Sequence, residues 1–454
     1  MNLNTPRRRE GWRRERASAS PPEVFKTIPI PASAPFWRKM LAFAGPGFLV
    51  AVGYMDPGNW ATDLAGGAQF GYALLSVIMI SNLMAILLQH LCVKLGIATG
   101  RDLAQACRDH YSQPVAVALW ILCELAIAAC DLAEVVGSAI GLELLFGIPL
   151  VWGCLFTGLD VMLVLFLQNK GFRYIEALVV TLIVTIGGCF LAELIFTRLD
   201  PIALLLGFVP SATILRNKEM LFIAIGILGA TVMPHNLYLH SSIVQTRNIQ
   251  PTSASRRETI RYGTMDSSFA LMCALFINGA ILVMSAAAFH WSGHKDVAEI
   301  QDAYKLLSPL LGVGASTLFA LALLASGQNS TLTGTLAGQI VMEGFLNIRI
   351  RPWLRRLITR AIAIVPAVAV IAIYGEDKTT ELLIWSQVIL SLQLPFAVIP
   401  LIKFTSERAK MGEFSNPLWI NLLAWPVALI IVALNAKLLI DFFAPASWQN
   451  ALGI

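Results

Sequence analysis

Long apolar runs separated by short polar segments dominate this chain. A transmembrane helix needs about 20 mostly apolar residues, and eleven segments reach that length. They lie near residues 42–69, 72–95, 114–142, 149–168, 175–196, 221–246, 264–290, 309–342, 357–374, 379–402 and 417–440. The pattern predicts an all-α polytopic membrane protein. Its membrane domain would cover residues 41–441, between a disordered basic tail at 1–40 and a short tail at 442–454.

The composition supports a membrane location. Hydrophobic residues make up 57% and charged residues 13% of the chain, whereas a soluble domain has roughly 25% charged residues. This excludes a cytosolic enzyme and a nucleic-acid binder. The N-terminal tail and the loops after even-numbered spans hold 26 of the 33 Lys and Arg residues. The positive-inside rule then predicts a cytoplasmic N-terminus and an external C-terminus. We expect the protein to lie in the plasma membrane, which would be the inner membrane of a bacterium.

Two of the apolar segments are interrupted by polar residues and proline. Residues 53–60 read GYMDPGNW and residues 230–237 read ATVMPHNL, so that Pro57 aligns with Pro234 and Asp56 with Met233. Proline lacks an N–H and disrupts a helix, and unwound backbone persists in a membrane only where it lines a cavity or a ligand. Matching breaks in spans one and six predict two inverted five-helix repeats, spans 1–5 and 6–10, plus an eleventh span. This arrangement is typical of secondary transporters with a midplane site.

The residues at the breaks indicate what is bound. Asp56 near the bilayer centre requires a cation or a proton. Asn59 offers an amide oxygen, Gly53 and Ala230 offer backbone carbonyls, and Met233 offers a thioether. A sulfur ligand favours soft first-row ions over sodium, magnesium or calcium. The set therefore suits Mn²⁺ or Fe²⁺, with Cd²⁺ as a mimic. The ion is substrate, and we expect no cofactor.

The motifs DPGN at 56–59, MPHN at 233–236 and GQNSTLTGT at 327–335 closely resemble the Nramp family of divalent metal transporters. The resemblance runs from about residue 41 to residue 441. It implies a LeuT-type fold and proton-coupled uptake of Mn²⁺ or Fe²⁺. It also implies metal coordination by Asp56, Asn59 and Met233 with the carbonyls of Gly53 and Ala230, and places Gln387 of span ten near the metal.

Span three carries three acids, Glu124, Asp131 and Glu134, inside an apolar stretch. At 100° per residue they share one helix face. Buried acids on one stripe indicate a proton relay or partners for basic residues, and the family resemblance supports the relay for Asp131 and Glu134. His235 could accept a proton because histidine titrates near neutrality. His240 could serve a cytoplasmic exit path or merely pack.

Residues 326–338 are almost all small or hydroxyl-bearing. Small residues allow close helix approach, and hydroxyl groups can line a water-filled path. We therefore expect this segment to be the polar cytoplasmic half of a long span eight. The seven cysteines include no CxxC pair, and we interpret them as small apolar residues.

Three other functions are compatible with parts of this pattern. A sodium-coupled amino-acid transporter would have the same architecture, but Asp56 would repel a substrate carboxylate. A membrane metalloenzyme would need a cluster such as HExxH, and none of the six histidines lies in that setting. A passive channel is a third alternative, although discontinuous repeats favour alternating access. The expected partners are a divalent metal ion, protons and the bilayer, without nucleic acid or an obligatory protein.

Overall fold

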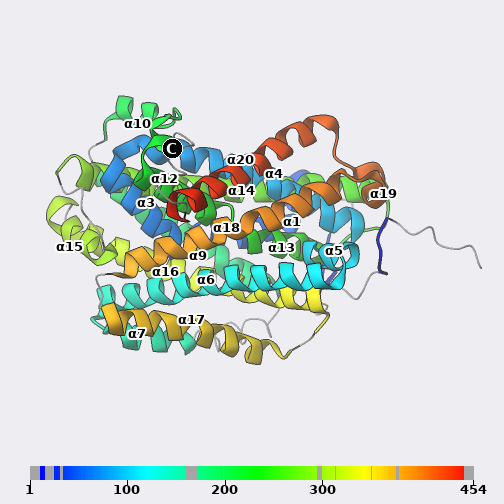
Figure 1. The fold of residues 1–454 in the computed structure, drawn as a ribbon, viewed down its shortest axis with the longest axis horizontal. Coiled ribbons are helices and arrows are strands. Elements are labelled where there is room, and N and C mark those ends of the chain that lie inside the picture. Colours follow the sequence, from blue (N-terminus) through cyan, green and yellow to red (C-terminus); the bar gives the residue numbers. More distant parts are fainter. Residues whose placement is uncertain are drawn as a thin grey trace, which may run out of the picture.

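Helices account for nearly all of the structure, and many of the long ones lie alongside one another (Figure 1). The computed structural model describes residues 11–15, 25–30, 34–159, 172–197, 199–293, 299–311, 313–348, 350–374 and 378–443. The helices of the first half are α1 (Phe36–Phe43), α2 (Pro46–Gly53), α3 (Pro57–Phe70), α4 (Leu75–Thr99), α5 (Leu103–His110), α6 (Gln113–Phe146), α7 (Leu150–Phe156) and α9 (Phe172–Phe196). After them come α10 (Pro201–Gly207), α11 (Thr213–Arg216), α12 (Lys218–Thr231), α13 (Pro234–Ile243) and α14 (Ser253–Ser285). The last helices are α15 (Ile300–Leu311), α16 (Val313–Leu346), α17 (Pro352–Tyr374), α18 (Thr379–Ser406), α19 (Arg408–Met411) and α20 (Leu418–Phe443).

Short elements join these helices. The 3₁₀ turns are η1 (Gly71–Leu74), η2 (Thr157–Leu159), η3 (Val244–Thr246) and η6 (Gly412–Phe414), and η4 (Ala286–His290) is a π-helix that continues α14. Two short parallel strands, β1 (Ile28–Pro29) and β2 (Arg247–Asn248), pair Ile28 with Arg247.

A helix or a pair of helices overlaps each of the eleven predicted spans. The first and sixth spans consist of α2 with α3 and of α12 with α13. Within the described residues, seven helical stretches are long and apolar enough to cross a membrane, and two shorter apolar helices lie at Leu150–Leu159 and Leu357–Ile373. Residues 160–168 of the predicted fourth span and residues 444–454 lie outside the described residues.

The third helices of the two repeats, α6 and α16, each contain 34 residues and pack along one another. Their approach depends on small residues. A Cβ added at Gly327 would lie 2.2 Å from Oγ of Ser138, and one added at Gly141 would lie 2.9 Å from Cβ of Leu324. The close helix approach predicted for residues 326–338 is therefore confirmed.

The N-terminal segment is more ordered than expected. Trp12 is 6% exposed and packs edge-on against Phe404, with ring centroids 5.6 Å apart. The Arg101 guanidinium lies 4.8 Å and the Lys410 ammonium 5.1 Å from the centre of the indole ring. Cations near an aromatic face are attracted by its quadrupole. The indole is therefore held by both apolar and cationic groups.

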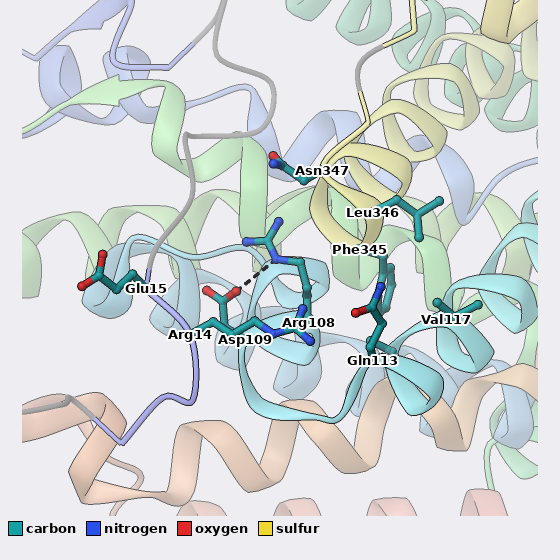
Figure 2. A pocket seen from close by; sticks show the side chains of 10 residues that line it. Arg14, Glu15, Arg108, Asp109, Gln113, Val117, Phe345, Leu346 and Asn347 are labelled. Atoms are coloured by element: carbon teal, nitrogen blue, oxygen red, sulfur yellow. Dashed lines mark hydrogen bonds and ion pairs between the residues drawn. The ribbon is translucent and has the colours of Figure 1, made fainter.

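Backbone hydrogen bonds extend this attachment. The N–H groups of Arg13 and Arg14 donate to the carbonyl of Asp109 at 2.9 and 3.2 Å. Figure 2 shows Arg14 and Glu15 lining one pocket with Asp109 of α5. Ile28 is also buried. Within the predicted tail at residues 1–40, Trp12 and Ile28 thus have buried contacts on the body of the molecule.

Candidate metal site at the two helix breaks

Both predicted breaks are present. Tyr54, Met55 and Asp56 separate α2 from α3, and Val232 and Met233 separate α12 from α13. The helix after each break begins at a proline, Pro57 or Pro234. Proline is favoured at the first helical position because its missing N–H would have no intrahelical acceptor there. Asp56 and Met233 are thus the N-cap residues of α3 and α13.

The same two prolines determine which carbonyls lack a helical donor. In a continuous helix the carbonyls of Gly53 and Ala230 would accept from residues 57 and 234, four positions later. Both of those residues are proline and have no N–H to donate. Both carbonyls are buried with their residues. The carbonyls of Gly53 and Ala230 therefore lack the donor that a continuous helix would give them.

The side chains of Asp56, Asn59 and Met233 lie at these breaks and are almost completely buried. Asp56 Oδ1 accepts a hydrogen bond from the backbone N–H of Asn59 at 2.8 Å. Asn59 Oδ1 has no hydrogen-bond partner among the described residues. A Cβ added at Gly53 would lie 3.0 Å from Sδ of Met233. The two breaks therefore face each other closely, and their polar atoms include an unsatisfied amide oxygen.

Gln387 of α18 approaches the first break. A Cβ added at Gly58 would lie 1.8 Å from its Nε2, so only glycine leaves room for this side chain beside Pro57 and Asn59. Gln387 is fully buried, its Nε2 donates to Ser386 Oγ at 2.9 Å, and its Oε1 has no partner within the described structure. A second amide oxygen is thus unpaired at the site.

Neighbouring helices satisfy the other carbonyls of the first break. Asn278 Nδ2 of α14 donates to the carbonyl of Tyr54 at 2.8 Å, and Ser326 Oγ of α16 donates to that of Met55. Asn236 Nδ2 of α13 donates to the carbonyl of Val50 at 3.4 Å. The unwound segment is therefore fixed from three sides.

Asp131 and Glu134 of α6 are buried, at 6% and 0% exposure. Glu134 Oε1 accepts from Ser330 Oγ at 3.0 Å, and its Oε2 lies 3.5 Å from NH2 of Arg360. Arg360 NH1 also donates to the carbonyl of Asp131 at 3.5 Å. The structure thus brings the two acids together with a buried cation from α17. The sequence analysis missed Arg360, although a lone charge inside an apolar run was a usable signal.

Glu124 lies apart from this pair. It is seven residues before Asp131, or about 10 Å along the helix at 1.5 Å per residue. Its side chain is half-buried, and its Oε1 accepts from Trp120 Nε1 at 2.9 Å. The three predicted acids share one helix but do not form one cluster.

The two predicted histidines are both buried in α13. His235 follows Pro234 directly, and its Nδ1 has no partner in the described part of the chain. His240 Nδ1 pairs with Gln89 Oε1 at 2.9 Å, and Gln89 Nε2 donates to the Tyr54 hydroxyl at 2.8 Å. A continuous hydrogen-bonded chain therefore connects His240 with the first break.

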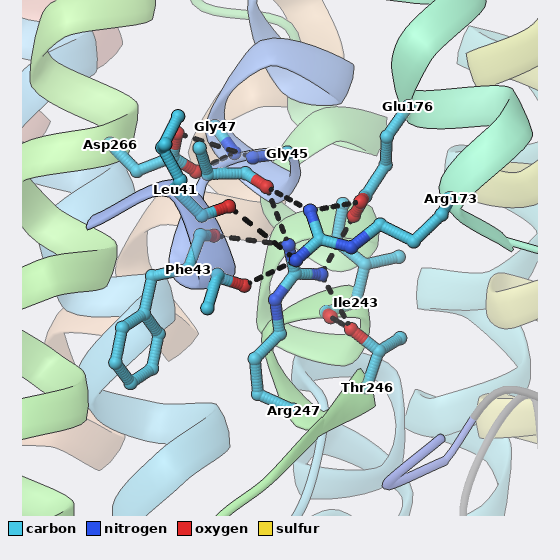
Figure 3. A network of polar contacts seen from close by, with 12 residues as sticks. Leu41, Phe43, Gly45, Gly47, Arg173, Glu176, Ile243, Thr246, Arg247 and Asp266 are labelled. Carbon is cyan, nitrogen blue, oxygen red and sulfur yellow. Dashed lines mark hydrogen bonds and ion pairs between the residues drawn. The ribbon is translucent and has the colours of Figure 1, made fainter. Parts of the chain in front are cut away.

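A charged network holds the beginning of α2 on the predicted cytoplasmic side (Figure 3). Arg247 NH1 donates to Glu176 at 2.7 Å, and its NH2 donates to the carbonyls of Phe43 and Ala44 at 3.0 and 2.8 Å. Asp266 accepts from the backbone N–H groups of Gly45 and Gly47 at 3.3 and 2.7 Å. Three separate elements, α9, β2 and α14, therefore fix this end of the broken first span.

Comparison with known proteins gives a consistent result. The family described as natural resistance-associated macrophage protein-like, Nramp, matches residues 47–441. The chain is 68% identical over 421 residues to the divalent metal cation transporter MntH of a Nostoc species, covering 92% of this chain and 95% of that one. It is 61% identical over 436 residues to the protein of the same name from Listeria monocytogenes serotype 4a, covering 96% and 97%.

Solved structures agree with these relatives. The crystal structure of the Eremococcus coleocola manganese transporter in complex with an aromatic bis-isothiourea substituted compound matches with a TM-score of 0.87 and 42% identity, covering 96% of this chain and 94% of that one. Mhp1, a nucleobase-cation-symport-1 family transporter, matches with a TM-score of 0.59 at 14% identity, covering 90% and 96%. The second match concerns the fold alone and confirms the predicted LeuT-type fold class. The chain therefore belongs to the Nramp family of divalent metal cation transporters.

Proposed function

We propose that this transporter imports Mn²⁺ or Fe²⁺ across the plasma membrane, coupled to protons, by alternating access. The ion binds between the two breaks, to the side chains of Asp56, Asn59 and Met233 and to the carbonyls of Gly53 and Ala230. Cd²⁺ is a further substrate. The observation that carries this proposal is the facing of the two breaks, each with a carbonyl that a proline has deprived of its helical donor.

The donor set supports a transition metal. One carboxylate supplies charge, amide and carbonyl oxygens supply neutral donors, and the Met233 thioether supplies the soft ligand that sodium, calcium and magnesium do not favour. We place Gln387 Oε1 as a further oxygen donor, because it is buried and unpaired beside Gly58. A sodium-coupled amino-acid transporter fits less well, since Asp56 would repel a carboxylate substrate at the same break.

We infer that Asp131 and Glu134 carry the protons, with Arg360 as their counter-charge. Glu134 lies next to Cys130, which in turn contacts Asp56, so the acids are close to the ion without sharing its ligands. His235 is a buried acceptor one residue beyond Pro234 and Met233. His240 would carry protons through its hydrogen bond to Gln89, which continues to the Tyr54 hydroxyl. Glu124 lies apart from this pair, so any part it has in the proton route lies nearer the N-terminal end of α6.

Proteoliposomes test metal transport and coupling together. Mn²⁺ added outside should enter and acidify a lumen that contains a pH indicator, and Asp56→Ala should abolish both signals. Asp302→Ala, which alters an exposed acid of α15 with half its side chain in solvent, is the control. Mn²⁺ entry without any proton movement, under every imposed gradient, would refute the coupling.

A pair of acid variants tests the proton route. Glu134→Gln should lower the number of protons moved per Mn²⁺, because the buried carboxylate beside Arg360 is removed. Glu124→Gln is the matched control on the same helix, since its carboxylate contacts Trp120 instead. An equal effect of both changes would contradict the special role of the Asp131 and Glu134 pair.

Selectivity tests the thioether. Met233→Ala should retain some Mn²⁺ uptake but admit competition by Ca²⁺, because the soft donor is lost while the oxygen donors remain. Met84→Ala, at another buried methionine in α4, is the control. If Ca²⁺ competes equally poorly before and after the change, Met233 does not select the metal.

A further inference from the structure

Cys130 of α6 lies between the proposed metal site and the buried acids. It is 1% exposed. Its Sγ is 3.9 Å from Oδ2 of Asp56 and 3.7 Å from Oε1 of Glu134. The side chain also belongs to a small buried cluster with Met233 and Leu390. The thiol of Cys130 therefore contacts the Asp56 carboxylate and belongs to the same buried cluster as Met233.

The separation of the Cys130 sulfur and the Asp56 oxygen can be compared with metal geometry. For tetrahedral Zn²⁺, with a metal–oxygen distance of about 2.1 Å and a metal–sulfur distance of about 2.3 Å, the two donors lie roughly 3.6 Å apart. At a 90° octahedral angle the same bonds give roughly 3.1 Å. The observed 3.9 Å is closer to the tetrahedral value, and a larger soft ion such as Cd²⁺ lengthens both bonds.

Other atoms at the site support a ligand at this place. Asn59 Oδ1 and Gln387 Oε1 are both buried without a partner in the described structure. A buried amide oxygen without a donor is unfavourable, so these oxygens indicate a bound species. The site therefore holds two unpaired amide oxygens and two sulfur side chains, Met233 and Cys130, of which the Cys130 sulfur contacts the Asp56 carboxylate.

We propose that Cys130 is a second sulfur ligand, specific to thiophilic ions such as Cd²⁺, and that it makes this transporter bind Cd²⁺ more tightly than Mn²⁺. The inference rests on the proposed metal site at Asp56 and Met233. On binding, a cadmium–sulfur bond forms and the thiol proton passes to Glu134, the nearest carboxylate to Sγ. Mn²⁺ prefers oxygen donors and leaves Cys130 protonated.

Purified full-length protein titrated with Cd²⁺ tests the proposal. A thiolate bound to Cd²⁺ gives an ultraviolet ligand-to-metal charge-transfer band, which a thioether or a carboxylate does not give. The wild type should show this band with one Cd²⁺ bound. Cys130→Ser should lose it, and the ratio of the Cd²⁺ to the Mn²⁺ dissociation constant should rise at least about tenfold, as expected for the loss of a contact to the metal.

Cys123→Ser is the matched control, because Cys123 is buried on the same face of α6 two turns earlier. It should keep the band and both affinities. Serine retains a hydrogen-bonding group beside Asp56 and Glu134, and Cys130→Ala provides a second variant that removes the sulfur if serine perturbs the fold.

The outcomes separate this proposal from the proposed function. A band that persists in Cys130→Ser and Cys130→Ala, while Asp56→Ala abolishes Mn²⁺ binding, would overturn the thiol ligand and leave the metal site intact. A band that is lost in Cys130→Ser and retained in Cys123→Ser supports the thiol ligand. Absence of Mn²⁺ transport in liposomes, with the band still dependent on Cys130, would refute the transport claim alone.

Discussion

Arg360→Met should be strongly destabilising because of the buried charge that it leaves behind. Arg360 and Glu134 are 3% and 0% exposed, and their charged atoms lie 3.5 Å apart. Removing one member of a buried ion pair costs roughly 3–5 kcal/mol, whereas replacing both members by uncharged groups is often close to neutral. The double variant Arg360→Met with Glu134→Gln should therefore be more stable than Arg360→Met alone.

The free energy of unfolding can be measured by SDS titration of the protein in mixed micelles. Lys305 and Asp302 of α15 provide a control pair with the same 3.5 Å separation but with side chains 72% and 50% exposed. Exposed pairs contribute about 0–1 kcal/mol, so Lys305→Met should have little effect. Two results would refute this reasoning. Arg360→Met could lower the free energy of unfolding no more than Lys305→Met does, or the double variant could show the sum of the two single losses. Either result would mean that burial does not strengthen the Arg360–Glu134 ion pair.

Three further changes test separate contacts. Gly58→Ala places a Cβ 1.8 Å from Gln387 Nε2 and should weaken Mn²⁺ affinity about tenfold or more by calorimetry; unchanged affinity would remove Gln387 from the site. Gly45→Ala introduces a side chain at φ +140°, 2.3 Å from Glu176 Oε1, and should cost about 1–3 kcal/mol in the SDS titration; equal stability would contradict this. Trp12→Ala should release residues 11–15 and speed tryptic cleavage there; an unchanged cleavage rate would mean that the indole does not hold the segment. The control for both glycine changes is Gly188→Ala, which has no atom near an added Cβ, and the control for Trp12→Ala is Trp37→Ala, at a side chain that is 75% exposed.

The features that the sequence predicted correctly depend on local chemistry. Pro57 and Pro234 were usable signals because proline lacks an N–H and its ring clashes with the preceding turn. Proline alone does not decide the break, since α17, α18 and α20 continue through Pro366, Pro395, Pro400 and Pro426. The two breaks are distinguished by the polar residues beside Pro57 and Pro234. The eleven apolar segments likewise follow from length and composition. The close packing of α16 on α6 was predictable because most of residues 326–338 are small or hydroxyl-bearing.

The features that were missed depend on contacts between distant segments. Trp12 lies in a basic, proline-rich stretch that is typical of disorder, yet Phe404, Arg101 and Lys410 surround its ring. The partner of Glu134 is Arg360, the only charged residue within the predicted ninth span, and the fold shows that α17 packs against α6 there. Cys130 was interpreted as an apolar residue, and only its distances to Asp56 and Glu134 suggest chemistry.

The hydrogen bonds around the first break explain how an unwound segment can still present defined ligands. Asn278 binds the carbonyl of Tyr54 and Ser326 binds that of Met55, so these two groups are not available to an ion. Gly53 precedes them and has lost its helical donor to Pro57. The carbonyl of Ala230 lacks its helical donor for the same reason, because Pro234 stands four residues later. If the ion binds at the breaks as proposed, α14 and α16 contribute by donating hydrogen bonds to two carbonyls of the first break, although neither helix supplies a proposed ligand.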